Sequence, residues 1–382
     1  MAQDGSETAA ETTQTRNGLQ TLGATLRPWL VLALVCGFFS LFAKFRDVFW
    51  TRDYLPNVFQ QSARNVVLAV GMSFVIMTGG IDLSVGSVLA LAGVALGLSL
   101  SGTLPNWMAF VMAAPFAMLA AWTLRSRLKS LEPWAQLSIL CGVLFLVEIL
   151  MGWGLARGLA GGVKMEGAIV VCLLIGLACG LVNGMGIALG RIPPFVMTLG
   201  MMSAARGLTL YATDGSSVPT QIPRFMALGQ GLPLSVIALV VVVLGTLLLS
   251  RFRAGRYVLA IGGNEQAARL SGVDVVANKT LAYALAGICA AIGAVMVTAM
   301  FGQALTNAGT GAELEAIAAV VIGGTRLTGG QGSIVGALVG ALTITVITSG
   351  LLLVQVPATL QQVILGGIIV LTVFIDQIRA KK

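Results

Sequence analysis

Four carboxylates lie within or beside the long apolar stretches of this sequence: Asp82, Glu148, Glu313 and Glu315. An ionisable side chain at bilayer depth is costly and usually marks an ion, proton or substrate pathway. Proton-coupled pumps use relays of Asp, Glu and His, but this chain has no histidine and few such acids. Two interpretations of Asp82, which follows Gly79-Gly80, stay open: it organises a site or gate, or it caps a helix.

Other chemistries are missing from the sequence. It contains no GxxxxGK[ST] phosphate loop for ATP, and without His it has no His-based triad or His metal ligand. We therefore expect no catalytic centre, no metal site and no cofactor. The five cysteines lie in apolar stretches without a CxxC pair and are predicted to be buried core residues: Cys36, Cys141, Cys172, Cys179 and Cys289. Active transport by such a chain would draw on an ion gradient or on another polypeptide.

The elements that position these residues are predicted to be membrane-spanning helices. Of the 382 residues, 57% are hydrophobic and 10% are charged, against about a quarter charged in average soluble domains. With a mean hydropathy of +0.93, this composition excludes a soluble globular protein and predicts an all-α, polytopic integral membrane protein. The net charge of +8 is better explained by basic residues in cytoplasmic loops than by nucleic-acid binding.

Hydropathy divides the chain into a polar tail and a membrane domain. Residues 1–27 lack the basic start and small-residue cleavage site of a signal peptide and are predicted to be a disordered cytoplasmic tail. Residues 28–382 form the predicted transmembrane domain. Its candidate spans are 28–43, 64–81, 83–100, 105–122, 134–154, 167–189, 192–210, 233–250, 280–301, 312–324, 331–353 and 357–375. The shortest, 312–324, is open to interpretation as a crossing, a half-helix or a re-entrant piece.

The positions of the basic residues test this topology. With the N-terminus in the cytoplasm, alternation of the spans puts three basic groups inside: Arg125-Arg127-Lys129, Arg191, and Arg251-Arg253-Arg256. The loop 44–64 disagrees, because it would lie outside although it holds Lys44, Arg46, Arg52 and Arg64. That loop is the weak point of the predicted topology.

Glycines recur every four residues in two of the candidate spans. Gly176, Gly180 and Gly184 form one such series, and Gly332, Gly336 and Gly340 form the other. Small residues at this spacing line one face of a helix and let a neighbouring helix approach closely. We interpret both series as tight helix packing rather than as hinges.

The polar stretch 251–279 contains the signals of a short helix. Asn264 is a good N-cap, Arg269 falls in the last turn and Gly272 is a plausible C′ glycine, with Gly262-Gly263 before the helix. A helix as short as 264–271 is marginal in isolation. We therefore expect it to pack against the membrane domain or a partner protein, the alternative being a helix that lies on the membrane surface.

Four longer motifs resemble the monosaccharide permease family of bacterial ABC importers, which includes the ribose, xylose, arabinose and galactose permeases. They are GGIDLSVGS (79–87), GRIPPFVMTLGMMSAARGL (190–208), GRYVLAIGGNEQAARLSGV (255–273) and AIAAVVIGGTRLTGGQGS (316–333). The third contains a sequence similar to the EAA-type coupling loop of importer permeases. The IDLSVGS form distinguishes the chain from the related branched-chain amino acid permeases.

This resemblance implies a multi-pass permease of about 10–12 transmembrane segments in the bacterial inner membrane, with residues 28–382 as its transmembrane permease domain. It implies three protein partners: a cytoplasmic ATPase, a periplasmic sugar-binding protein and a second permease copy, most simply as a homodimer. Family members usually have six spans before the coupling loop, so 102–166 would be a two-span insertion. The loop 251–279 would contact the ATPase through Gly262, Gly263, Asn264, Glu265, Ala267, Ala268, Arg269 and Gly272.

The predicted function is therefore a permease subunit, not itself an enzyme, that forms the path for a monosaccharide. Polar residues near the midplane are candidates to line that path: Asp82, Ser84, Ser87, Asn183 and Thr198. The alternative is an ion-coupled secondary transporter of a small polar solute, which the coupling-loop motif and the sparse carboxylates disfavour. A membrane enzyme would need a nucleophile–base pair or a metal cluster, and the sequence presents neither.

Overall fold

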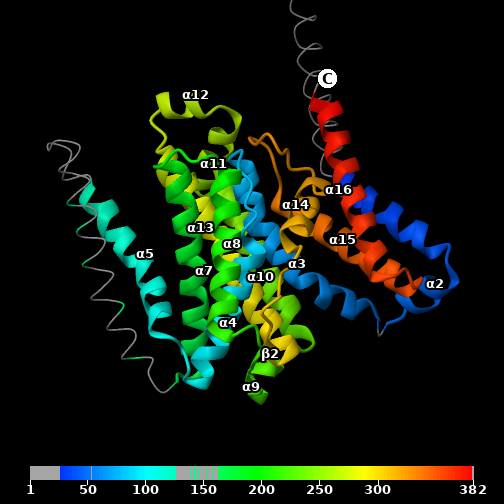
Figure 1. Cartoon of the computed structure of the whole chain (residues 1–382). Helices are drawn as coiled ribbons and strands as arrows, with labels where there is room; N and C mark the ends of the chain where they lie inside the picture. Colours follow the sequence, from blue (N-terminus) through cyan, green and yellow to red (C-terminus); the bar gives the residue numbers. More distant parts are fainter. Residues whose placement is uncertain are drawn as a thin grey trace, which may run out of the picture.

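The computed structural model describes residues 26–52, 54–125 and 162–380, together with five single residues between 126 and 161. Within these ranges the chain is a bundle of helices (Figure 1). The α-helices in chain order are Leu26–Ser40, α2 (Ala43–Phe49), α3 (Tyr54–Met77), α4 (Val85–Ser101), α5 (Asn106–Arg125), α7 (Met165–Ala188), α8 (Pro194–Thr213), α9 (Pro223–Met226), α10 (Leu232–Arg251), α11 (Arg253–Gly263), α12 (Glu265–Leu270), α13 (Val275–Phe301), α14 (Ala312–Ile322), α15 (Ile334–Leu353) and α16 (Ala358–Ala380). A 3-10 helix, η1 (Ala227–Gly229), and an antiparallel pair of two-residue strands, β1 (Val218–Pro219) and β2 (Gln303–Ala304), complete the described elements.

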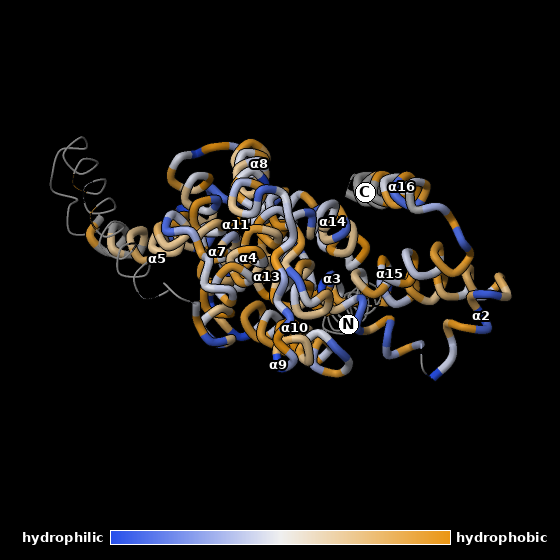
Figure 2. The backbone as a smooth tube through the Cα atoms, turned by 60° about the horizontal axis from the view of Figure 1, so that its bottom comes forward, coloured by the Kyte–Doolittle hydropathy of each residue, from blue (hydrophilic) through white to orange (hydrophobic). Residues whose placement is uncertain are grey.

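Four of these helices, α7, α10, α13 and α15, are long and apolar enough to cross a membrane. A fifth span results if Leu26–Ser40 and α2, which meet at 118°, form one broken span. Helices α3 and α8 have 24 and 20 residues, but polar side chains such as Gln60 and Arg206 lower their hydropathy. The all-α, multi-pass class is confirmed, and hydrophobic residues run along most of the described helices (Figure 2). The described residues contain fewer clear spans than the 12 apolar segments predicted.

The predicted insertion, 102–166, and the predicted tail, 1–27, are only partly described by the structure. Helix α5, the first half of the predicted insertion at 102–166, packs on α7 at one side of the bundle (Figure 1). The second predicted span of that insertion, 134–154, lies outside the continuous described ranges. The predicted tail, 1–27, is described only from Leu26, where the first helix already begins.

Helix α3 begins at Tyr54, ten residues before the start of the predicted span 64–81. The polar stretch 60–65 is helical although its hydropathy is low, and two of its side chains meet polar partners on other helices. Gln61 Oε1 accepts from the Ser349 hydroxyl of α15. Arg64 donates to Glu315, with 2.9 Å between Arg64 Nη2 and Glu315 Oε2. Arg64 is thus a helix residue with a partner, and it does not count among the loop cations that disagreed with the topology.

Helix α14 is the short segment whose role the sequence left open. Its eleven residues span about 16 Å at about 1.5 Å each, which is roughly half the hydrocarbon thickness. Before it, Gly309 and Gly311 have φ values of +70° and +80°. The chain turns there in a left-handed conformation that would strain any residue with a side chain. Helix α14 is therefore too short to cross a membrane by itself, and its length fits the half-helix and the re-entrant interpretations equally.

Five of the six glycines in the two series form tight helix contacts, whereas Gly332 precedes α15 and a Cβ there would meet the side chains of Met77 and Thr325. A Cβ at Gly176, Gly180 or Gly184 of α7 would overlap backbone atoms of α13 at Gly287, Tyr283 or Thr280. In the second series, a Cβ at Gly336 or Gly340 of α15 would overlap backbone atoms of Gly323 or Ala319. The packing interpretation is confirmed at these positions, because no side chain separates the backbones.

Candidate functional site

The short helix predicted at 264–271 is present as α12, which stands out at one end of the bundle, opposite α9 and β2 (Figure 1). Asn264 caps it, because its side chain accepts a hydrogen bond from the Ala267 amide at 3.0 Å. Gly272 follows the helix with a φ of +81°, as a C′ glycine does. Local capping signals were therefore enough to predict this helix and its ends.

Glu265, the first residue of α12, holds two cations. Its Oε1 accepts from Arg269 Nη2 at 3.1 Å, and its Oε2 accepts from Lys279 Nζ of α13 at 2.7 Å. The hydrogen bond from Lys279 is the main reason that the pKa of Glu265 lies below its usual range. The carboxylate thus links α12 to the first turns of α13.

Only one face of helix α12 packs against the rest of this chain. Ala268 is buried in a small cluster with Ile261 and Val275, whereas Leu270 is 90% exposed. A single exposed apolar side chain is common on protein surfaces, so Leu270 marks this face of α12 as open without assigning it a partner. Of the two environments expected for α12, packing on the membrane domain is confirmed for the Ala268 face.

Gly262 and Gly263, which precede α12, have different surroundings. A Cβ at Gly262 would overlap the Met77 carbonyl at the end of α3 and the Gly330 amide, whereas a Cβ at Gly263 would meet no atom. The Gly330 amide itself donates to the Met77 carbonyl at 3.0 Å. The end of α11 therefore lies directly against the end of α3 and the loop between α14 and α15.

The turn between α3 and α4 holds Asp82, which is 2% exposed. Its Oδ1 accepts from the Ser84 amide at 2.8 Å and from the Ser84 hydroxyl at 2.6 Å. Asn183 of α7 donates to the same hydroxyl at 2.9 Å. Asp82, Ser84 and Asn183 thus form one hydrogen-bonded group that ties this turn to α7.

The remaining predicted path residues are also buried. Thr198 of α8 donates to the carbonyls of Pro194, at 2.9 Å, and Ile81, at 3.4 Å, and Ser87 lies in the first turn of α4. Asn183 Oδ1 and the Tyr283 hydroxyl are buried without a hydrogen-bond partner among the described residues. The five candidates therefore surround one turn, and their assignment to a sugar path stays a prediction.

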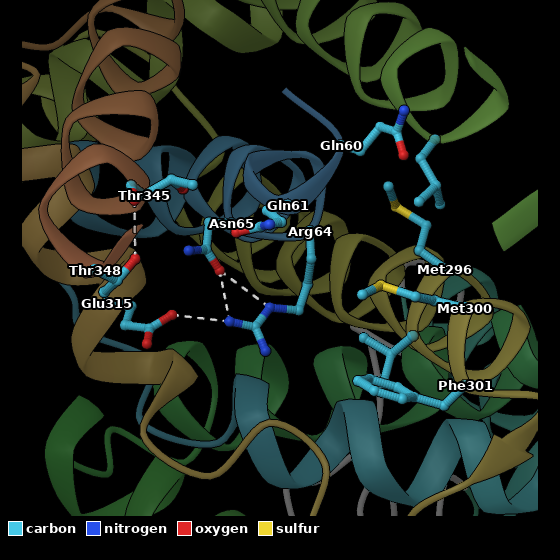
Figure 3. A pocket seen from close by; sticks show the side chains of 12 residues that line it. Gln60, Gln61, Arg64, Asn65, Met296, Met300, Phe301, Glu315, Thr345 and Thr348 are labelled. Carbon is cyan, nitrogen blue, oxygen red and sulfur yellow. Dashed lines mark hydrogen bonds and ion pairs between the residues drawn. The ribbon is translucent and has the colours of Figure 1, made fainter. Parts of the chain in front are cut away.

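A separate cavity of about 260 Å³ lies between α3, α10, α13, α14 and α15 (Figure 3). Three amides, two threonines and the Arg64–Glu315 ion pair form its polar wall, and apolar side chains such as Met296, Met300 and Phe301 form the rest. Arg64 Nε and Nη2 also donate to Asn65 Oδ1, at 3.0 and 2.8 Å.

Sequence reasoning missed this cavity. The sequence carried two signs of it: a basic residue, Arg64, at the start of a predicted apolar span, and an acid, Glu315, within a short apolar run. Their separation of 251 residues gives no local sign that they meet. The cavity's other polar residues are Gln60, Gln61, Asn65, Thr345 and Thr348, which are uncharged and resemble ordinary helix residues.

A second cavity, of about 430 Å³, lies beside α12. The turn between α7 and α8, with Arg191, forms one side, and Glu265, Arg269 and Lys279 form the other. In the part of the chain that the structure describes, no group of three or more His, Cys, Asp or Glu residues could hold a metal ion.

Comparison with known proteins gives consistent results. The family model described as "Branched-chain amino acid transport system / permease component" matches residues 54–373. The ribose import permease protein RbsC of Escherichia coli (strain K12) is 36% identical over 337 residues, which cover 86% of this chain and 87% of the relative. The D-allose transport system permease protein AlsC of the same strain is 31% identical, with 92% and 91% covered. The xylose transport system permease protein XylH of Haemophilus influenzae is 31% identical, with 92% and 96% covered. No solved structure matches this chain significantly.

Proposed function

This chain belongs to the monosaccharide permease family of ABC importers, and we propose that its own substrate is a monosaccharide of the ribose or xylose type. It is a multi-pass membrane protein and a transport subunit. Relatives named for ribose, allose and xylose import match along most of both chains, and this supports a sugar rather than an amino acid as substrate. Within that class, the identity of the sugar is a question for transport assays.

We infer that a separate cytoplasmic ATPase supplies the energy and acts on α12. The observation that carries this proposal is the placement of α12: it projects from one end of the bundle, exposes Leu270 and is linked to α13 through Glu265 and Lys279. Gly262 adds a second link, to the end of α3. A displacement of α12 would therefore be transmitted to two long helices of the membrane domain: α13, through the Glu265–Lys279 ion pair, and α3, through Gly262 of α11.

The buried turn around Asp82 is proposed to act in the path or its gate. It follows α3 directly, and the end of α3 contacts Gly262 of α11. Hydrogen bonds from Asn183 of α7 and Thr198 of α8 hold the same turn. Movement of α11 and α12 would then change the position of Asp82 and Ser84 relative to α7 and α8.

The remaining partners are proposed from the family. A periplasmic sugar-binding protein would deliver the sugar at the end of the bundle where α9 and β2 lie, opposite α12 (Figure 1). A second copy of this chain, as a homodimer, would complete the path across the bacterial inner membrane. These proposals supply the direction of transport, which is import.

The test is uptake by vesicles that contain this permease with its ATPase and enclosed ATP, supplied outside with the sugar-binding protein. We expect uptake of labelled D-ribose or D-xylose that requires ATP and the ATPase. Dissipating the ion gradients should leave uptake unchanged. Uptake that instead follows an imposed ion gradient without the ATPase would favour the ion-coupled alternative and contradict the importer.

A further inference from the structure

The Arg64–Glu315 pair in the cavity of Figure 3 uses only part of its hydrogen-bonding capacity within the protein. Arg64 uses Nε and Nη2 for Asn65 and Glu315, and Glu315 uses Oε2 for Arg64. Arg64 Nη1 and Glu315 Oε1 have no hydrogen bond or ion pair to another side chain among the described residues. Both side chains are partly open to the cavity, with Arg64 33% and Glu315 25% exposed, so each has a polar atom that a ligand could reach.

The charge of this pair is unsuited to a lipid-facing surface. Arg64 lies within α3, and Glu315 lies in the first turn of the short helix α14. Charged groups at bilayer depth face protein or a water-filled cavity, because lipid tails leave them unsolvated. The open side of the cavity therefore meets water or protein, as a transport path requires.

The other walls suit a sugar ring. Thr345 and Thr348 donate to carbonyls of their own helix, at 3.0 Å in each case, so their oxygens remain able to accept a hydrogen bond. Across the cavity lie Met296, Met300 and Phe301, which offer apolar surface. A monosaccharide presents the matching faces: hydroxyls along its edge and C–H groups on its ring faces. A volume of about 260 Å³ is just below the usual range for drug-sized ligands, as expected for a smaller one.

We propose that this cavity is a station that holds the monosaccharide during transport, with a pair of sugar hydroxyls bridging Arg64 Nη1 and Glu315 Oε1. This inference rests on the proposed function. It names a site apart from the Asp82 turn, and one that the sequence motifs do not include. The station lies at the wall formed by the last turn of α13, so it is linked by that helix to Lys279 and α12.

The first test compares isosteric substitutions on one helix. Thr348→Val removes a hydroxyl that lines the cavity, and Thr343→Val removes a hydroxyl that donates to Val339 of the same helix but does not line it. With Gln61→Leu as a second cavity variant, we expect uptake of D-ribose or D-xylose at low sugar concentration to be about three- to tenfold slower, as for one lost hydrogen bond. Thr343→Val should transport like wild type.

The second test detects occupancy directly. The Thr348→Cys variant should react with a polar thiol reagent, with the wild-type protein giving the background from its own cysteines, and the transported sugar should slow this reaction. If wild-type vesicles take up neither sugar, the proposed function is wrong and this inference falls with it. If wild type transports but both cavity variants match Thr343→Val and the sugar does not slow labelling of the Thr348→Cys variant, the cavity is not the station.

Discussion

Lys279 Nζ lies 2.7 Å from Glu265 Oε2, and this contact joins the exposed helix α12 to the longest helix of the described bundle. Helix α13 has 27 residues and spans about 40 Å at about 1.5 Å each. Its last residues, Met300 and Phe301, line the cavity that contains Arg64 and Glu315. One continuous helix therefore connects the proposed ATPase contact with the proposed sugar station.

The first prediction concerns the charge of Glu265. Glu265→Lys should weaken ATPase association, because it repels Lys279 and Arg269 and puts a positive charge at the positive end of a helix dipole. The measurement is co-purification of the ATPase with the permease. Gln266→Lys, which puts a lysine at the next, exposed position without breaking the Glu265 ion pairs, is the control. Equal ATPase recovery with Glu265→Lys and wild type would remove α12 from the proposed contact.

The second prediction concerns pH. The pKa of Glu265 is lowered from its ordinary 4.5, so its ion pairs stabilise α12 fully above that pH and are lost as the pH falls through the lowered value. A spin label on Leu270→Cys, at an exposed position, should become more mobile only in that acid range. In Glu265→Gln the label should be equally mobile at every pH. An acid transition that survives in Glu265→Gln would assign it to another group.

The third prediction uses two neighbouring glycines. Gly262→Ala should impair folding or coupling, since its Cβ overlaps the Met77 carbonyl and overpacking costs about 1–3 kcal/mol. Gly263→Ala, whose Cβ meets nothing, is the matched control. Thermal unfolding and ATP-driven uptake would measure both effects. Similar losses in the two variants would contradict the close contact between α11 and α3.

The fourth prediction concerns the end of α12. Gly272 has a φ of +81° and open space around it, so any cost of substitution comes from the backbone conformation. Gly272→Val should cost about 1–3 kcal/mol locally and reduce sugar-stimulated ATP hydrolysis, whereas Gly272→Asn should be milder because Asn tolerates this conformation. Both proteins should insert normally into the membrane. If valine and asparagine behave alike, the left-handed C′ position does not set the geometry of α12.

The fifth prediction concerns Asp82. Asp82→Asn keeps an acceptor for the Ser84 amide and hydroxyl, so it should fold and associate with the ATPase but transport more slowly. Asp82→Ala loses both hydrogen bonds, at about 1–3 kcal/mol for each unsatisfied group, and should also lower thermal stability. Uptake and thermal unfolding separate the two effects. Normal uptake by Asp82→Asn at wild-type expression would reduce Asp82 to a replaceable cap.

The features predicted well from the sequence are those with local causes. Asn264, Glu265 and Gly272 define α12 within nine residues, and glycines four residues apart predict that α7 approaches a neighbour closely. The Arg64–Glu315 contact has no such cause, because only tertiary packing brings α3 and α14 together. For the same reason the start of α3 was predicted too late: its polar first half is stabilised by partners distant in the sequence.

The glycine contact between α7 and α13 limits which motions can drive transport. Where Gly176, Gly180 and Gly184 bring the two backbones together, their ridges interlock without flexible side chains between them, so sliding would require the helices to separate first. These two helices should therefore move as one rigid body during transport. The motion that drives transport has to come from elements that contact this pair of helices through side chains, and α12, joined to α13 by the Glu265–Lys279 ion pair, is one of them.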